Sequence, residues 1–134
     1  DRSVGAVAAF VGTVRDVNAD ASVAAMTLEH YPGMTEKALA SIIDDAKARW
    51  AIADALVIHR VGALRPADQI VLVGVTSAHR GDAFAACEFI IDYLKTRAPF
   101  WKKEETPDGA RWVEARASDD DAAARWRAPS RPAE

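Results

Sequence analysis

Four cationic side chains crowd one short segment of an otherwise acidic chain. The stretch DYLKTRAPFWKKE, residues 92–104, carries Lys95, Arg97, Lys102 and Lys103 around a Pro-Phe-Trp turn, whereas the 134-residue chain has a formal net charge of -3. Like charges and partial desolvation lower the pKa of an ammonium group, which makes the amine available as a base or a nucleophile. The segment is therefore either a solvated surface loop or the wall of a pocket that holds an anion and acts on it.

The position of Lys95 on a predicted helix distinguishes it from its cationic neighbours. A helix is predicted over residues 82–97, and a wheel of about 100° per residue places Lys95 on the side of Cys87 and Ile91, with Arg97 near the opposite side. Lys95 must then extend past the helix end or line a concave site. The helix dipole alone also favours a cation in the last turn, so the spacing leaves both interpretations open.

A second candidate anion site lies where a predicted strand enters that helix. The segment TSAHRGD, residues 76–82, places His79 and Arg80 at a strand-to-helix junction, where unpaired backbone N–H groups favour an anion. Arginine adds a planar fork of donors that matches phosphate or carboxylate. The alternative is that Ser77 caps the helix and Arg80 is solvated. Arg15 lies at the end of the first predicted strand, where arginines are mostly surface residues, so its position alone does not indicate a binding site.

The histidines and the cysteine have a simpler interpretation. His30 and His59 lie within strand patterns, which predicts hydrogen-bonded structural histidines. Cys87 lies on the apolar side of its helix and is expected to be a small buried residue. One cysteine and three histidines make a dedicated metal site improbable, and we predict none.

The order of strand and helix patterns predicts an α+β fold, with a sheet and two main helices packed on it. The first two strands are expected to form an antiparallel pair, and Thr35 is expected to cap the first helix. Strands are predicted at 4–14, 23–31, 54–62, 68–78, near 101–105 and near 110–115, and helices at 36–50 and 82–97, with turns at 17–22, 64–68 and 106–109.

Composition narrows the class of protein. We expect a single catalytic domain over residues 1–116 and a tail over 117–134 that is partly helical and then disordered. A slightly acidic balance argues against a nucleic-acid partner, and the sequence has no apolar run long enough for a membrane span. A lone cysteine favours a cytoplasmic location.

Five motifs in order resemble the catalytic, large subunit of molybdopterin synthase. They are LEHYPGMTEKAL (28–39), IHRVGALRPAD (58–68), VGVTSAHR (73–80), DYLKTRAPFWKKE (92–104) and RWVEA (111–115). The resemblance runs from about Gly5 to Trp126. It implies an α/β-hammerhead-like arrangement and a sulfurtransferase of molybdenum cofactor biosynthesis. That enzyme converts cyclic pyranopterin monophosphate to molybdopterin without a cofactor.

The resemblance also implies partners. Sulfur would arrive as the C-terminal Gly-Gly thiocarboxylate of a small ubiquitin-like subunit, and two large subunits would form the central homodimer of a heterotetramer. Lys95 matches the main catalytic lysine and Lys102 a second functional lysine that also binds substrate. Arg15, His79 and Arg80 match anion-binding positions, some of them reaching the pocket from the neighbouring large subunit. Arg97 and Lys103 are expected to contact substrate, and Phe100 and Trp101 to line the pocket.

Two other functions fit the residues alone. One is a non-catalytic module that binds an anion or a peptide and docks a ubiquitin-like partner. The other is a phosphate-releasing hydrolase that binds a pterin or a nucleotide. The role of Lys95 and the requirement for a thiocarboxylated partner separate these functions from sulfur transfer.

Overall fold

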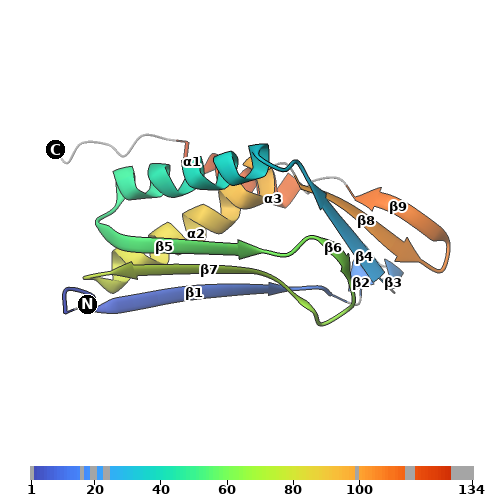
Figure 1. Cartoon of the computed structure of the whole chain (residues 1–134), viewed down its shortest axis with the longest axis horizontal. Helices are drawn as coiled ribbons and strands as arrows, with labels where there is room; N and C mark the ends of the chain where they lie inside the picture. Colours follow the sequence, from blue (N-terminus) through green and yellow to red (C-terminus); the bar gives the residue numbers. More distant parts are fainter. Residues whose placement is uncertain are drawn as a thin grey trace.

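Two antiparallel sheets and two long helices make up most of the described chain (Figure 1). The computed structural model describes residues 2–15, 17–18, 21–22, 25–98, 100–113 and 117–127. The strands are β1 (Ala6–Thr13), β2 (Val17–Asn18), β3 (Ala21–Ser22), β4 (Ala25–His30), β5 (Ile52–His59), β6 (Gly62–Leu64), β7 (Gln69–Ser77), β8 (Phe100–Thr106) and β9 (Gly109–Val113). The helices are α1 (Met34–Arg49), α2 (Arg80–Arg97) and α3 (Ala117–Ala124). The predicted α+β fold, with antiparallel strands and two main helices, is confirmed.

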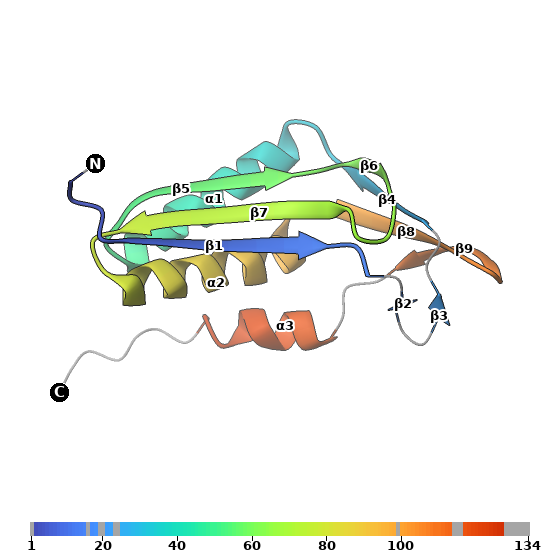
Figure 2. The same ribbon diagram turned by 90° about the horizontal axis from the view of Figure 1, so that it is seen from below.

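The first sheet has the order β1-β7-β5, with β7 at its centre. Successive strand side chains point to opposite faces, so Val71, Val73 and Val75 share one face of β7 and are buried in the main core. Both long helices cover this inner face, and α2 runs back along β7 after the strand ends (Figures 1 and 2). The last turn of α2 therefore lies at the end of the sheet where β7 begins and β5 ends.

The second sheet has the order β6-β4-β8-β9 and meets the first sheet at that same end (Figure 1). Met26 and Leu28 on β4 and Leu64 on β6 form a small core with Val14, which follows β1. β8 follows directly after α2, so residues at the start of β8 and at the end of α2 are brought together by the chain itself.

The predicted pairing of the first two strands is wrong. β1 bonds to β7, whereas β4 lies between β6 and β8 in the other sheet. The segment 17–22, predicted as a turn, contains the β2–β3 hairpin, which pairs Val17 with Ser22. Two strand patterns that follow each other in the sequence suggest a hairpin, which is why the pairing was predicted. The strand that bonds to β1 is β7, about sixty residues later, and hydrophobic periodicity within a short window cannot identify such a distant partner. The segment 54–62, predicted as one strand, is divided between β5 and β6.

The predicted cap of α1 is also wrong. The helix begins at Met34 after Gly33, whose φ of 86° lies in the left-handed region that favours glycine. Thr35 is buried inside the first turn, and its Oγ1 accepts a hydrogen bond from the Tyr31 N–H at 3.2 Å. The Glu36 carboxylate accepts the N–H of Gly33 instead. Among the described residues, no helix combines the length and the apolar character needed to cross a bilayer.

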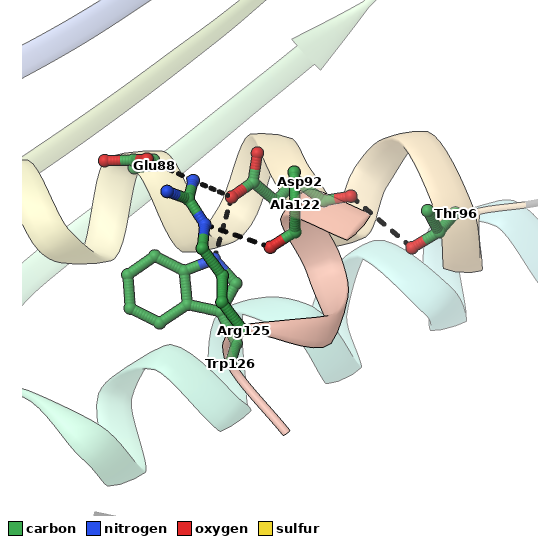
Figure 3. A network of polar contacts seen from close by, with 6 residues as sticks. All are labelled: Glu88, Asp92, Thr96, Ala122, Arg125 and Trp126. Atoms are coloured by element: carbon green, nitrogen blue, oxygen red, sulfur yellow. Dashed lines mark hydrogen bonds and ion pairs between the residues drawn. The ribbon is translucent and has the colours of Figure 1, made fainter. Parts of the chain in front are cut away.

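α3 is fastened along α2 by the two residues Arg125 and Trp126 (Figures 2 and 3). The Arg125 guanidinium donates to Asp92 at 2.9 Å and also contacts Glu88. The Trp126 Nε1–H donates to the same Asp92 carboxylate at 2.7 Å, while its ring packs edge-on against Trp50. The 117–134 segment, expected to be partly helical, contains α3 (Ala117–Ala124), and residues 128–134, expected to be disordered, lie outside the described residues.

Candidate functional site

Lys95 and Lys102 act electrostatically on one histidine, His59, from two different elements. Lys95 is in the last turn of α2, Lys102 is on β8, and His59 is the last residue of β5. The positive charges of both lysines act on the His59 imidazole, as does His30 at the end of β4. The fold thus places both lysines that were predicted to be catalytic within electrostatic range of His59, near the junction of the two sheets.

The pleat of β8 separates the two neighbouring lysines. Lys102 is half-buried and stands opposite Leu28, whose side chain belongs to the inner core of the second sheet. Lys103 is exposed, and its Nζ lies 5.8 Å from the centre of the Trp112 ring on β9. Because consecutive strand residues face opposite ways, Lys102 faces the site and Lys103 faces away from it. Within one chain, Lys103 is therefore poorly placed for the substrate contact predicted for it.

An aromatic stack holds the histidine beside the lysines. The His59 ring lies against Phe100 with centroids 3.8 Å apart and planes inclined by 16°. His30 lies on the same phenyl ring more loosely, with centroids 6.3 Å apart. Phe100 begins β8 two residues before Lys102, so the stack also fixes the start of the strand that carries this lysine. The position of Phe100 in the pocket wall stays a prediction.

The surroundings of His59 favour its neutral form. Burial lowers the pKa of His59 below its ordinary value of 6.5, and the positive charges of Lys102, Lys95 and His30 lower it further. The hydrogen bond to the Arg60 carbonyl acts in the opposite direction. The prediction of a hydrogen-bonded histidine is confirmed at this position by the 2.7 Å separation between His59 Nδ1 and the Arg60 carbonyl oxygen.

Arg97 turns toward α1 rather than toward Lys95. Its Nη1 donates to Asp45 at 2.8 Å and its Nη2 donates to Ser41 at 3.1 Å. Its guanidinium also lies 5.2 Å from the centre of the Tyr93 ring. These contacts connect α1 to α2, so they give Arg97 a structural role; the substrate contact predicted for it stays a prediction.

His79 and Arg80 lie at the opposite end of α2 from Lys95 (Figure 2). Arg80 precedes Lys95 by fifteen residues, which corresponds to about 22 Å along an α-helix. His79 and Arg80 are both exposed. His79 is the N-cap residue of α2, and no side chain among the described residues caps the helix there. Ser77 does not cap the helix: its Oγ accepts the His79 N–H at 3.2 Å and donates to the Ala51 carbonyl at 2.8 Å. This end of α2 is a second cationic corner, separate from Lys95 within one chain.

Arg15 belongs to the end of the molecule that carries Lys95. It follows β1 beyond Val14, whose N–H donates to the Asp68 carbonyl at 2.9 Å in the turn before β7. Arg15 is exposed, and β1 flanks β7 on the side away from β5. One chain therefore places Arg15, Lys95 and Lys102 at one end and the His79–Arg80 corner at the other.

His59 was not predicted to be part of the site, although the strand pattern contains a signal for it. Ala55, Val57 and His59 alternate with exposed residues, which places all three on the inner face of β5. The two residues before His59 on this inner face are apolar. A histidine in such a partly buried position is less common than another apolar residue, and this is the signal that the sequence contains. The side chain of Trp101, expected to line the pocket, lies outside the described residues.

The described residues offer no alternative centre of metal or thiol chemistry. No group of three or more His, Cys, Asp or Glu side chains within the described ranges is arranged to hold a metal ion. Cys87 is buried, and burial raises the pKa of its thiol, so the prediction of a small packed residue is confirmed.

Comparison with known proteins identifies relatives along most of the chain. Residues 1–97 match the sequence model of the family described as MoaE protein. The molybdopterin synthase catalytic subunit of Ralstonia nicotianae is 70% identical over 123 residues, which span 92% of this chain and 70% of that protein. The subunit of the same name from Escherichia coli is 66% identical over 91% of this chain and 81% of its own length.

Solved structures agree with this result. The molybdopterin biosynthesis MoaE protein of Burkholderia ambifaria superposes with a TM-score of 0.78 at 63% identity, covering 94% of this chain and 82% of that one. The molybdopterin synthase structure from Staphylococcus aureus gives a TM-score of 0.81 at 37% identity, covering 85% and 83% of the two chains. The sequence motifs, the fold and these likenesses together show that the chain belongs to the MoaE protein family.

Proposed function

We propose that this chain is the sulfurtransferase subunit that converts cyclic pyranopterin monophosphate to molybdopterin, with sulfur from the C-terminal thiocarboxylate of a small ubiquitin-like partner. The observation that carries the proposal is that Lys95 and Lys102, from two different elements, both act electrostatically on His59 where the two sheets meet. Two relatives named as molybdopterin synthase catalytic subunits share 70% and 66% of their aligned residues with this chain. The reaction belongs to molybdenum cofactor biosynthesis.

The charges of the two reactants explain why cations gather here. The phosphate of the substrate and the thiocarboxylate of the partner are both anionic, and a cleft lined by cations raises the local concentration of such ligands. Lys102, half-buried on the inner face of β8, is suited to hold the substrate and to stabilise charge that develops during transfer. Lys95, exposed at the end of α2, can reach the incoming tail and exchange a proton with it.

The separation of the two cationic corners supports a homodimer. The His79–Arg80 corner cannot join Lys95 within one chain, because α2 holds the two about 22 Å apart. A two-fold axis running across the strands would reverse the second copy and bring its His79–Arg80 corner to the Lys95 end of the first. In this arrangement each pocket would be completed by the neighbouring subunit.

The outer face of the first sheet is suited to that contact. It is the face of β1, β7 and β5 opposite the long helices, and register places Val11, Leu72 and Ile58 in one row across it. Val7 at the edge is 71% exposed and Leu56 is 54% exposed. Contiguous apolar surface of this kind marks an interface more often than free surface. We assign it to the second large subunit, with one small subunit bound at each end of the resulting heterotetramer.

Two further expectations belong to the same proposal. We assign catalysis to residues 1–116 and a supporting role to the 117–134 segment, since the described part of that segment fastens to α2 through Arg125 and Trp126. We place the protein in the cytoplasm, because its one cysteine, Cys87, is buried as a free thiol.

Replacement of Lys95 tests the catalytic assignment. Lys95→Ala should abolish sulfur incorporation into the cyclic phosphate substrate, measured by mass spectrometry of the product, while its affinity for the partner stays close to that of the original chain. Lys37→Ala removes an exposed lysine on α1 and serves as the matched control. Normal product formation by Lys95→Ala would contradict the catalytic role and favour a docking module. Turnover of substrate without the thiocarboxylated partner would instead favour a hydrolase.

A further inference from the structure

His59 differs chemically from its neighbours in the site. Lys95 and Lys102 carry only donor groups when they are protonated. His59 is instead an imidazole on the inner face of β5, held flat against Phe100 at 3.8 Å. Because the ring is partly buried and stacked, its orientation is set by the fold rather than by solvent.

The hydrogen bond of His59 determines which of its nitrogens can accept a proton. The Arg60 carbonyl oxygen, 2.7 Å from Nδ1, can only accept a hydrogen bond, so Nδ1 carries the proton. In the neutral ring, Nε2 then holds the free lone pair. Burial and the nearby lysines disfavour a second proton on the ring, so Nε2 is available as an acceptor at neutral pH.

The proposed sulfur transfer needs such an acceptor. When the thiocarboxylate sulfur adds to a carbonyl carbon of the substrate, the carbon–oxygen π bond opens, and the oxygen takes the electron pair and a proton from solvent. The new carbon–sulfur bond makes an acyl thioester that joins the partner's terminal glycine to the substrate. Water must then add to the acyl carbon, the carbon–sulfur bond must break, and sulfur stays on the substrate as a thiolate. The water gives up one proton as it attacks, and the new carboxyl group releases a second proton to solvent as it becomes a carboxylate.

We propose that His59 is the proton acceptor of this site and that its Nε2 takes the proton of the water that releases the partner's tail. The inference rests on the proposed function and adds a residue to it. Lys95 and Lys102 hold the anionic groups around the reacting carbon, and His59 supplies a lone pair. A positioned base of this kind contributes about a hundredfold or more to a hydrolytic step.

Two substitutions separate proton transfer from packing. His59→Phe keeps a flat ring against Phe100 and removes both nitrogens. His59→Asn keeps a short donor for the Arg60 carbonyl and removes the Nε2 acceptor. His30→Phe is the matched control, since His30 lies on the same phenyl ring at a centroid distance of 6.3 Å.

The assay is single-turnover release of the partner's tail, with the thiocarboxylated partner bound, from about pH 5 to about pH 8. The unaltered chain should lose rate on the acid side, as His59 becomes protonated. Both His59 variants should be slower by about a hundredfold near neutral pH and should lack this acid-side decline. Partner affinity should be unchanged in both. His30→Phe should keep the rate near neutral pH and should keep the decline, moved slightly to higher pH because one charge that lowers the pKa of His59 is gone.

Three results would overturn the inference. They are an unaltered rate in His59→Phe, a slow His59→Phe that keeps the acid-side decline, and a flat profile for the unaltered chain. If His59→Phe does not fold, as judged by circular dichroism, the same criteria apply to His59→Asn. Failure of the unaltered chain to make any product would count against the proposed function itself, which separates the two outcomes.

Discussion

Ser77 connects the fold to the second cationic corner, and replacing it with alanine should weaken both stability and substrate binding. Ser77 is the last residue of β7 and is completely buried. Its hydroxyl donates to the Ala51 carbonyl at 2.8 Å and accepts the His79 N–H at 3.2 Å. It is thus the contact that ties the start of α2 to the chain entering β5.

The structure sets the size of the effect. Ser77→Ala removes two hydrogen bonds in a buried place, each contributing about 0.5–1.5 kcal/mol, so the free energy of unfolding should fall by about 1–3 kcal/mol. The neighbouring Thr76 provides the control. Its hydroxyl lies 3.5 Å from the Asp54 carbonyl, at the limit of a hydrogen bond, so Thr76→Val should change the free energy by about 0.5 kcal/mol or less.

The assays are urea unfolding at a fixed protein concentration and steady-state sulfur transfer. Since Ser77 positions the backbone of His79, its loss should raise the KM for the cyclic phosphate several-fold and leave kcat nearly unchanged. The reasoning is refuted if Ser77→Ala unfolds at the same urea concentration as the unaltered chain. It is also refuted if the KM rises no more than in Thr76→Val.

Two further predictions concern single side chains. Cys87→Ser should keep full sulfur transfer and lose about 1 kcal/mol of stability, because the thiol is packed against the Val73 carbonyl at 3.8 Å; a folded but inactive variant would show that the thiol takes part in the reaction. The backbone N–H groups of Glu36 and Gly33 lower the pKa of the Glu36 carboxyl group in the folded chain below its ordinary value of 4.5. The ionised carboxylate therefore stabilises the fold at pH values above 4.5, and this stabilisation is lost as pH falls through the lowered pKa of the folded state. Glu36→Gln should therefore weaken the acid-side loss of stability in thermal melts across that range, and an identical pH dependence would contradict the assigned hydrogen bonds.

Elements with strong local patterns were predictable from the sequence, whereas their neighbours in space were not. The helix predicted at 82–97 is observed at Arg80–Arg97, because its apolar spacing and the proline that follows Ala98 define it locally. The partner of β1 was mistaken, since strand order depends on a contact between distant segments. A hydroxyl near a helix start likewise suggested Thr35 as a cap, but Gly33 reaches the required backbone conformation more easily.

The same limit applies to the residues of the candidate site: those within one short segment could be predicted together, and those from distant segments could not. Lys95 could be singled out from its charge and its position on the predicted helix, whereas the roles predicted for Lys95 and Lys102 came from the resemblance of the segment to the molybdopterin synthase large subunit. His59 could not be assigned to them from local pattern, because it comes from a strand more than thirty residues earlier and meets them only where the two sheets join. The orientation of Arg97 depends on Asp45 and Ser41, which belong to a different helix.

The length of α2 has a genetic consequence for the proposed enzyme. A variant that lacks Lys95 and a variant that lacks Arg80 would each be inactive alone, yet a mixed pair would contain one pocket with both residues intact. Random exchange between equal amounts of the two should restore about a quarter of the pockets in the population. Two defective alleles could then complement each other in one cell, which two defects in the same corner could not do.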